Sequence, residues 1–234
     1  HNAIGCGRVF AQGASLIDDA IASRALFEGE IWNELVENAI TQASTLHFIG
    51  LLSDGKVHSN INHLEAMLRE AKAQGVRSVR LHALTDGRDV PPLSALDYVD
   101  RIEAILEELS SDGFDYCIAS GGGRMKITMD RYDADWPMIE RGWQTHVRGE
   151  GRFFSSMSAA IETFRNENKG ILDQDLPAFV IERNGEAVGP VVDNDSVILF
   201  NYRRDRALEL TKAFEADELH EFDRGEKPQV VYAG

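Results

Sequence analysis

The chain has 234 residues, 43% of them apolar, and a formal net charge of −15 at pH 7. This length suits one large domain or two small ones, and the apolar content indicates a packed core rather than disorder. No apolar run approaches the roughly 18 residues that cross a bilayer. The excess of acidic residues argues against nucleic acid and against anionic membranes as partners, because both favour basic proteins.

In chain order we predict a helix over residues 10–23, a helix over 31–42, a strand over 45–52, a helix over 60–74, a strand over 78–84, a helix over 94–109, a strand over 116–119, helices over 134–146 and 156–167, strands over 178–182 and 196–201, and a helix over 206–216. Gly75 is placed to end the helix that precedes it, and Pro91-Pro92 to open the helix that follows. Asn184-Gly185 indicates a hairpin that makes the sheet locally antiparallel, and the polar tail turns β-like at 229–232. The alternation predicts an α/β protein, a three-layer α/β/α fold with a mostly parallel sheet.

Cys6 and Cys117 are the only cysteines of the sequence, and an apolar run around Cys117 places that side chain in the core. Two isolated thiols indicate no disulfide framework and fit a reducing compartment, so we expect a cytoplasmic protein. The chain begins with His1 and opens without a leader segment, so we expect it to be a piece of a longer protein.

The residues that follow four of the predicted strands carry the candidate chemistry. In an open α/β sheet, ligands bind at the carboxyl ends of the strands, where the loops emerge. From the charged and imidazole side chains at these positions we select as candidates His58, Arg88, Asp89, Arg124, Arg131, Arg203 and Arg206. Gathering cations at one edge of an acidic protein has an electrostatic cost, so we expect a small polyanion as the ligand.

The residues 121–123 are three consecutive glycines, which we expect to let the backbone approach a phosphate closely. No Walker lysine-serine pair follows them, so they do not form a nucleotide P-loop.

Each of these residues also has a simpler interpretation. A single arginine after a strand is usually solvated or ion-paired, and Asp89 beside Arg88 fits either an ordinary ion pair or a proton shuttle. His58 and His63 are five residues apart, which matches no common metal-ligand spacing. The acidic run from Asp130 to Asp135 lacks the glycine and the final glutamate of a calcium loop. We therefore predict no metal site in this chain.

Taken together, the motifs closely resemble those of the cofactor-independent (2,3-bisphosphoglycerate-independent) phosphoglycerate mutases of the alkaline-phosphatase-like superfamily. The matching stretches are residues 1–8, 52–59, 82–89, 123–131 and 200–206. The resemblance implies a two-domain enzyme, an isomerase of glycolysis and gluconeogenesis that interconverts 3-phosphoglycerate and 2-phosphoglycerate through a phosphoserine intermediate. One domain carries the serine and two divalent metals, which we expect to be manganese, and an inserted domain holds the glycerate.

This chain resembles the inserted domain alone. The resemblance implies a hinge or linker over residues 1–13, an α/β substrate-binding (phosphotransferase) domain over 14–216, and a terminal part of the domain or return linker over 217–234. We expect the serine and the metals to lie outside this chain, no cofactor within it, and an inactive isolated chain. We further expect a monomer whose partners are the phosphoglycerate substrate and the missing metal-bearing domain of the same protein.

The resemblance also assigns roles to the residues after the strands. Asp89 is the expected general acid/base for the glycerate hydroxyls, and His58 is the catalytic residue that orients the phosphoryl group. The residues expected to bind phosphate or carboxylate are Arg203 and Arg206, with Arg88, Arg124 and Arg131 in support. The alternatives are a stand-alone, non-catalytic module that binds small phosphorylated anions, and a structural α/β domain with surface arginines.

Overall fold

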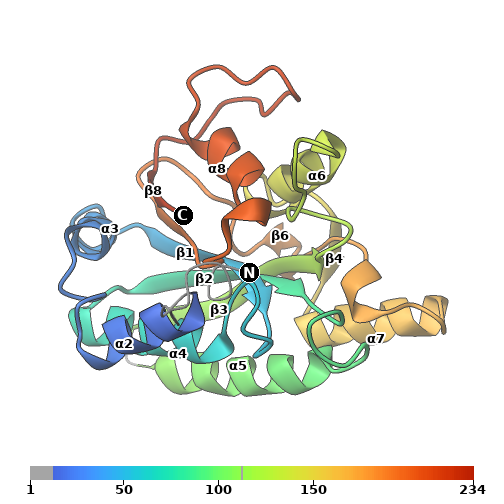
Figure 1. Cartoon of the computed structure of the whole chain (residues 1–234), viewed down its shortest axis with the longest axis horizontal. Helices are drawn as coiled ribbons and strands as arrows, with labels where there is room; N and C mark the ends of the chain where they lie inside the picture. The colour runs from blue at the N-terminus through green and yellow to red at the C-terminus, as the bar shows by residue number, and fades with distance from the viewer. Residues whose placement is uncertain (1–12, 112) are drawn as a thin grey trace, which may run out of the picture.

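In this computed structural model, which describes residues 13–111 and 113–234, a single sheet of eight strands is covered by helices on both faces (Figure 1). The strands are β1 (Thr45–Leu52), β2 (Ser78–Thr85), β3 (Asp115–Gly123), β4 (Arg152–Phe154), β5 (Phe179–Arg183), β6 (Glu186–Ala187), β7 (Ser196–Leu199) and β8 (Val231–Ala233). The helices are α2 (Ala14–Ala22), α3 (Glu30–Thr41), α4 (Ile61–Gln74), α5 (Ala95–Leu109), α6 (Trp136–His146), α7 (Met157–Glu167) and α8 (Leu208–Glu215). The predicted three-layer α/β/α fold is confirmed.

The sheet is mostly parallel, as predicted. Its strands follow the order β4-β5-β3-β2-β1-β7-β8, and β6 pairs with β5. β1 pairs in parallel with β2 and β7, β2 with β3, β7 with β8, and β4 with β5. The Asn184-Gly185 turn joins β5 to β6 as an antiparallel hairpin, which confirms the turn prediction. The antiparallel pairing of β5 with β3 and the short strand β4 were not predicted.

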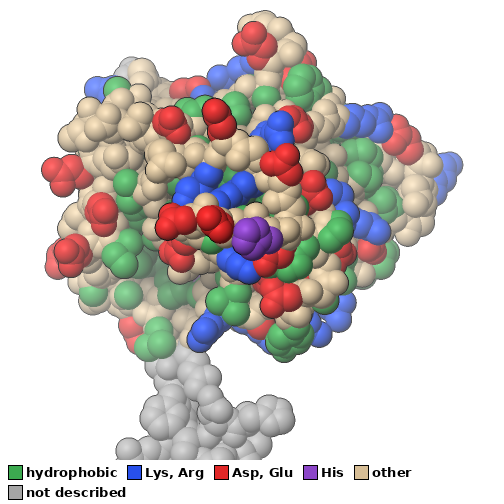
Figure 2. Space-filling view, turned by 90° about the horizontal axis from the view of Figure 1, so that it is seen from above, with side chains coloured by type: hydrophobic (Ala, Val, Ile, Leu, Met, Phe, Trp, Pro, Cys, Tyr) green, Lys and Arg blue, Asp and Glu red, His purple; other side chains and the backbone are tan. Residues whose placement is uncertain are grey.

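The core lies on both faces of the sheet because the central strands are buried on both sides. In β1, Leu46 and Phe48 pack toward α3, α4 and α5, while Ile49 faces the opposite way, toward α6 and α8. Figure 1 shows α4, α5 and α7 below the sheet and α6 and α8 above it. Figure 2 looks down on the α6 and α8 side and shows acidic side chains interspersed with basic ones.

Local signals in the sequence explain where several helices begin and end. The side chain of Asn60 accepts a hydrogen bond from the Asn62 amide at 3.0 Å and caps α4, and Gly75 ends that helix at φ +98°. Pro91-Pro92 precede α5 in a turn and do not form its first turn, which corrects their predicted place. Arg206 closes a short 3-10 turn, Arg204–Arg206, and α8 begins only at Leu208.

β3 is longer than predicted and contains all three glycines of the 121–123 run. A Cβ on Gly121 would lie 2.4 Å from the Ala83 carbonyl oxygen, and one on Gly123 would lie 2.3 Å from that of Gln174. The Gly123 amide donates to the Leu176 carbonyl at 2.8 Å. The glycines are therefore required by close packing inside the sheet, and the expectation that they approach a phosphate is wrong.

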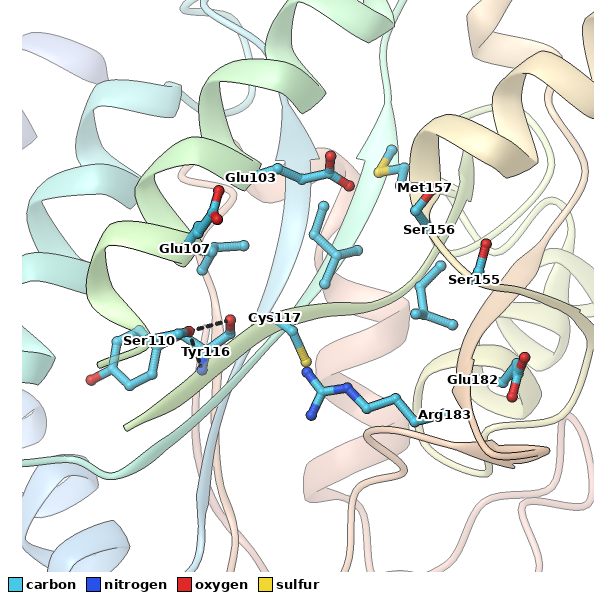
Figure 3. Close-up of a pocket in the computed structure, with 13 residues that line it drawn as sticks. Glu103, Glu107, Ser110, Tyr116, Cys117, Ser155, Ser156, Met157, Glu182 and Arg183 are labelled. Atoms are coloured by element: carbon cyan, nitrogen blue, oxygen red, sulfur yellow. Dashed lines mark hydrogen bonds between the residues drawn. The ribbon is translucent and has the colours of Figure 1, made fainter. Parts of the chain in front are cut away.

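Cys117 was predicted to lie in the core, but its side chain is only half-buried. It lines a pocket of about 360 Å³ between α5, α7 and the amino-terminal half of β3 (Figure 3). Burial raises the pKa of its thiol. Cys6 lies outside the described residues, as do residues 10–12 of the first predicted helix. In the described part of the chain, no helix has the length and apolar content to cross a membrane.

Candidate functional site

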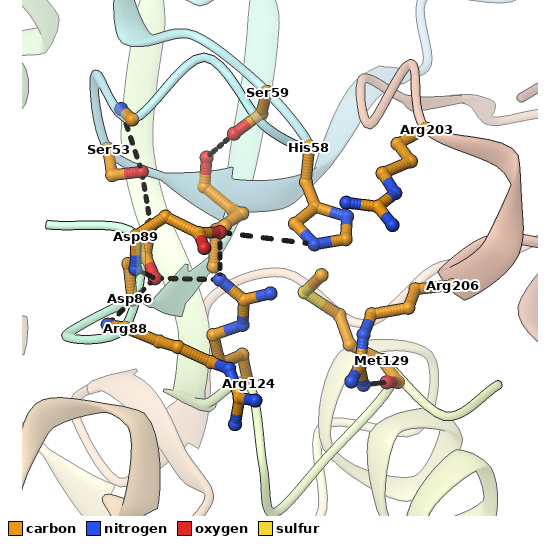
Figure 4. Close-up of polar contacts among 12 residues, drawn as sticks. Ser53, His58, Ser59, Asp86, Arg88, Asp89, Arg124, Met129, Arg203 and Arg206 are labelled. Carbon is orange, nitrogen blue, oxygen red and sulfur yellow. Dashed lines mark hydrogen bonds and ion pairs between the residues drawn. The ribbon is translucent and has the colours of Figure 1, made fainter. Parts of the chain in front are cut away.

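Four loops meet at the carboxyl edge of the sheet and carry the predicted site residues. The parallel strands β1, β2, β3 and β7 all end at this edge, so the loops that follow them are neighbours in space. Figure 4 shows side chains from these loops converging around His58 and Asp89. The sheet topology thus brings together residues that are up to 148 positions apart in the sequence, from His58 to Arg206.

Asp89 and Arg124 form the centre of the site. Arg124 Nη1 donates to Asp89 Oδ2 at 2.5 Å, and His58 Nε2 lies 3.9 Å from the same oxygen. Arg124 is almost wholly buried, whereas the Asp89 side chain is 18% exposed. Asp89 therefore connects a buried cation to the open side of the site. It pairs with Arg124 and not with its sequence neighbour Arg88, which corrects the simpler interpretation of that dipeptide.

Asp86 fixes the loop that carries Asp89. Its Oδ1 accepts from the amides of Arg88 and Asp89 at 3.1 and 3.0 Å and from Arg124 Nη1 at 2.7 Å. Its Oδ2 accepts from the Ser53 hydroxyl at 2.7 Å. These hydrogen bonds and the charge of Arg124 lower the pKa of Asp86 against the opposing effect of burial. The carboxylate is thus a fixed anchor for the loop and for Arg124.

His58 is held in its neutral form. Burial, followed by the nearby charge of Arg124, lowers its pKa to about 4 although Asp89 acts in the opposite direction. The Tyr202 amide donates to the His58 carbonyl at 2.8 Å and ties the β1 loop to the β7 loop. Among the described residues, His58 Nδ1 and Arg124 Nε are buried atoms with no hydrogen-bond partner. Such unsatisfied atoms at a site indicate groups prepared for a ligand.

Arg206 carries positive charge that its surroundings do not neutralise. Its Nη1 donates to the Met129 carbonyl, a neutral acceptor. Burial lowers the pKa of Arg206 most, followed by the charges of Arg124 and Arg131, and Asp205 acts in the opposite direction. This excess of cations over carboxylates is electrostatically favourable once an anion binds among them.

Arg203, Arg131 and Arg88 form the outer part of the site. Arg203 Nε lies 2.9 Å from Asp205 Oδ1, and Arg131 Nη1 lies 3.8 Å from Asp205 Oδ2. Both arginine side chains are about half exposed, and Arg88 is exposed as well. These side chains can therefore move toward a ligand, in contrast to the buried Arg124.

Sequence reasoning missed several residues that organise this site. Asp86, Ser53 and Asp205 position the arginines, and the carbonyl of Met129 receives Arg206. The signal for Asp86 was present, because a carboxylate directly after β2 is placed at the same edge as the arginines. The contact at Met129 has no signal in the sequence, because it depends on a backbone atom.

In the part of the chain that the structure describes, no three His, Cys, Asp or Glu side chains are grouped closely enough to hold a metal ion. The described residues therefore offer no site for the pair of divalent metals, which the resemblance places outside this chain.

The fold and the site together define an α/β domain that gathers arginines, a neutral imidazole and a carboxylate at the carboxyl edge of its sheet. The chain belongs to the family described as BPG-independent PGAM N-terminus, whose model matches residues 17–234. The family resemblance predicted from the motifs is confirmed.

Relatives support this membership along the whole chain. A Leptospira interrogans protein named "probable 2,3-bisphosphoglycerate-independent phosphoglycerate mutase" is 54% identical over 234 residues, which is all of this chain and 43% of the relative. The 2,3-bisphosphoglycerate-independent phosphoglycerate mutase of Trypanosoma brucei brucei is 48% identical, with the same coverage. A crystal structure of Leishmania mexicana phosphoglycerate mutase, described as determined at low cobalt concentration, superposes with a TM-score of 0.96 at 47% identity and covers 99% of this chain and 42% of that one. The chain thus spans less than half the length of these relatives.

Proposed function

We propose that this chain is the substrate-binding part of a 2,3-bisphosphoglycerate-independent phosphoglycerate mutase, an enzyme of glycolysis and gluconeogenesis that interconverts 3-phosphoglycerate and 2-phosphoglycerate. The names of relatives that match the chain from end to end support this proposal. The observation that carries it is the convergence of Arg124, Arg131, Arg203 and Arg206 at the carboxyl edge of the sheet, where Arg206 donates to a neutral carbonyl and Arg131 and Arg203 share one carboxylate.

The arginines suit the charge of the substrate. Phosphoglycerate carries a phosphate and a carboxylate, and the planar guanidinium binds either group through two parallel hydrogen bonds. Arg203 and Arg206 are the proposed principal ligands of these groups. Arg88 and Arg131 are exposed, so their side chains can move into contact with the substrate. Arg124 is buried beside Asp89 and contributes its positive charge from there.

Asp89 is the proposed general acid/base. When the phosphoryl group leaves one glycerate oxygen, that oxygen needs a proton, which the protonated Asp89 supplies. When the other hydroxyl attacks the phosphoryl group, the Asp89 carboxylate takes up its proton. His58 stays neutral near pH 7 because its pKa is about 4, so it offers one N–H donor to a phosphoryl oxygen without adding charge.

The remaining parts of the reaction belong, in this proposal, to the portion of the relatives that the chain does not cover. That portion supplies the serine that carries the phosphoryl group and two divalent metals, proposed to be manganese, of the alkaline-phosphatase-like type. In this proposal the hinge or linker between the two portions is formed by residues 1–13, of which 1–12 lie outside the described residues. The terminal part of the domain or return linker is formed by residues 217–234. The intact protein is proposed to be a cytoplasmic monomer.

A titration of 3-phosphoglycerate into this chain at low salt, followed by phosphorus NMR, tests the proposed ligand. We expect saturable binding by the wild type and loss of binding in the double variant Arg203→Ala, Arg206→Ala. The matched control is Arg148→Ala, Arg152→Ala, which removes two exposed, ion-paired arginines outside the site and changes the net charge equally. Equal weakening in both double variants would show a general charge effect, and retention of binding in the first would reject the arginine site.

A further inference from the structure

A continuous chain of buried polar side chains crosses the sheet next to α6, outside the site described above. Its members come from the residue before β7, from β1, β2 and β3, from the end of α6, and from the loop after β3. They are, in order, Asp195, His47, His82, Ser120, His146 and Thr128. None of them is more than 2% exposed. Burying six polar side chains costs free energy unless each of them is hydrogen-bonded, so such a cluster indicates a specific role.

Each member of this buried relay contacts the next at hydrogen-bond distance. His47 Nε2 lies 3.1 Å from Asp195 Oδ2, and His47 Nδ1 lies 2.9 Å from His82 Nε2. His82 Nδ1 lies 2.7 Å from Ser120 Oγ, which lies 2.8 Å from His146 Nδ1. His146 Nε2 lies 3.0 Å from Thr128 Oγ1. All ring nitrogens of the three histidines are therefore engaged.

The number of available protons gives the buried relay a single direction. The Asp195 carboxylate only accepts and already receives the amides of Thr45 and Val192, so His47 must donate from Nε2. His47 is neutral and accepts at Nδ1, which makes His82 donate from Nε2 and accept from Ser120. Ser120 then accepts from His146 Nδ1, and the Thr128 hydroxyl donates to His146 Nε2. Burial lowers the pKa of all three histidines, that of His146 to about 3, which agrees with neutral rings.

The end of the buried relay holds a strained turn. Thr128 has φ +70°, which is unfavourable for a β-branched residue, and the Met129 amide donates to the Ile127 carbonyl at 2.7 Å. An i to i+2 hydrogen bond around a residue with positive φ is typical of a classic γ-turn, which is rare and strained. Such strain persists where surrounding contacts over-determine the conformation, often at functional sites.

The contacts of Thr128 with α6 provide that restraint. Its hydroxyl donates to His146, and its amide donates to the Met138 carbonyl at 3.0 Å. A Cβ on Gly142 would lie 2.3 Å from Thr128 Oγ1, so α6 has a glycine at the position where the threonine enters. The last residue of the turn, Met129, presents its carbonyl to Arg206.

We propose that the buried relay from Asp195 to Thr128 is a positioning device that locks the turn at Thr128 and thereby holds the Met129 carbonyl in place for Arg206. Thr128 and His146 are positioning residues in this account, because both are buried and act on Arg206 only through the Met129 carbonyl. The inference concerns the placement of Arg206, and it rests on the proposed function only where it extends to phosphoglycerate binding.

The first test needs no variant. Long-range proton–nitrogen NMR of the wild-type chain reports which nitrogen of each histidine carries the proton. We expect Nε2–H for His47 and His82 and Nδ1–H for His146, with all three rings neutral at pH 7. Any other tautomer at His82 or His146, or a charged ring, would overturn the directional relay.

The second test breaks the buried relay and observes Arg206. Thr128→Val keeps the branched shape but removes the hydroxyl, and Ser120→Ala interrupts the relay two positions away. We expect both variants to lose the slowly exchanging guanidinium N–H signal of Arg206 and to bind 3-phosphoglycerate about tenfold more weakly. Thr128→Ser retains the hydroxyl but loses the methyl group, and we expect it to keep both the Arg206 signal and the wild-type affinity. If side-chain volume and not the hydroxyl were important, Thr128→Ser would lose both properties.

The outcomes separate this inference from the proposed function. If the wild type shows no slowly exchanging Arg206 signal, or if the folded Thr128→Val variant keeps it, the positioning role is rejected whether or not the ligand binds. The positioning role is supported if the wild type shows the Arg206 signal, Thr128→Val loses it and Thr128→Ser keeps it. This conclusion holds even if the wild type binds no 3-phosphoglycerate. That last result would count against the proposed substrate alone.

Discussion

Asp89 is partly exposed and its carboxylate is held by the buried Arg124, which suits the proposed transfer of a proton to and from a ligand. The two sides of this contact have separate tasks. Arg124 fixes the position of the carboxylate, while the exposed part of the Asp89 side chain is accessible to solvent. The proposed acid/base role therefore depends on Asp89 being able to gain and lose a proton, not on its size or its hydrogen bonds.

Asn in place of Asp89 separates these properties, since it keeps the shape and loses the proton transfer. In the intact protein, with this chain joined to the portion that its relatives carry, we expect Asp89→Asn to reduce turnover by about 10²–10⁴-fold. Binding of 3-phosphoglycerate should change little because the arginines remain. Coupled turnover assays and phosphorus NMR measure the two quantities, with the exposed Asp100→Asn as the control. Turnover close to that of the wild type would exclude Asp89 as the acid/base.

His58 makes stability depend on pH. Its pKa is about 4 in the folded chain and about 6.5 in an unfolded chain, because burial and Arg124 disfavour the charged ring. Between these values the unfolded state binds a proton that the folded state does not, so stability is fully present above pH 6.5 and falls as the pH is lowered toward 4. The shift corresponds to about 3 kcal/mol.

Urea unfolding at several pH values between 7 and 5 measures this dependence. We expect the free energy of unfolding to rise with pH in the wild type and to rise less steeply in His58→Gln. The buried His146, whose pKa is lowered to about 3, contributes in the same direction in both proteins. Identical slopes for the wild type and His58→Gln would show that His58 is not held neutral by its surroundings.

The site was partly predictable at the level of single residues. The positions of His58, Asp89 and the arginines follow from the rule that ligands bind at the carboxyl ends of strands. The burial of Arg124 does not follow, because its partner Asp86 lies 38 residues earlier and meets it only after β2 and β3 pair. Local sequence can place a side chain at an edge, but long-range pairing decides which charges neutralise one another.

β3 is the element whose sequence signal was most misleading. Glycine has a low preference for strands, so the predicted strand ended at residue 119, whereas β3 runs to Gly123. The glycines are needed because neighbouring backbone and the Phe179 ring approach too closely for a Cβ. By contrast, β1 and β2 are buried along nearly their whole length, although each contains a buried histidine, and their bounds were predicted to within one residue. β4, with three residues and little burial, gives no such signal.

Replacing Gly123 with alanine tests the packing role of this run. The added Cβ would lie 2.3 Å from the Gln174 carbonyl oxygen, and backbone there cannot move cheaply. We expect Gly123→Ala to lower the free energy of unfolding by about 1–3 kcal/mol, the usual cost of overpacking. Gly170→Ala is the control, since its Cβ would meet only Asn168 Oδ1, at 3.8 Å. Urea unfolding measures both; an unchanged Gly123→Ala variant would contradict the account of β3.

The whole molecule combines a net charge of −15 with a cluster of arginines at one edge of its sheet. The acidic surface of the rest of the chain disfavours polyanions such as nucleic acid, whereas a small anion can interact mainly with the clustered arginines. The chain covers 43% of a relative from Leptospira interrogans. In the proposed function, this portion binds and orients the substrate and the uncovered portion transfers the phosphoryl group.

The central claim is that phosphoglycerate binds among the loops after β1, β2, β3 and β7. A crystal structure of this chain with 3-phosphoglycerate at saturating concentration tests it most directly. The account predicts the ligand at the carboxyl edge of the sheet, with its phosphate or carboxylate on Arg203 and Arg206 and a hydroxyl within hydrogen-bond distance of Asp89. Ligand bound elsewhere, or a site that stays empty while solution measurements show saturation, would contradict it.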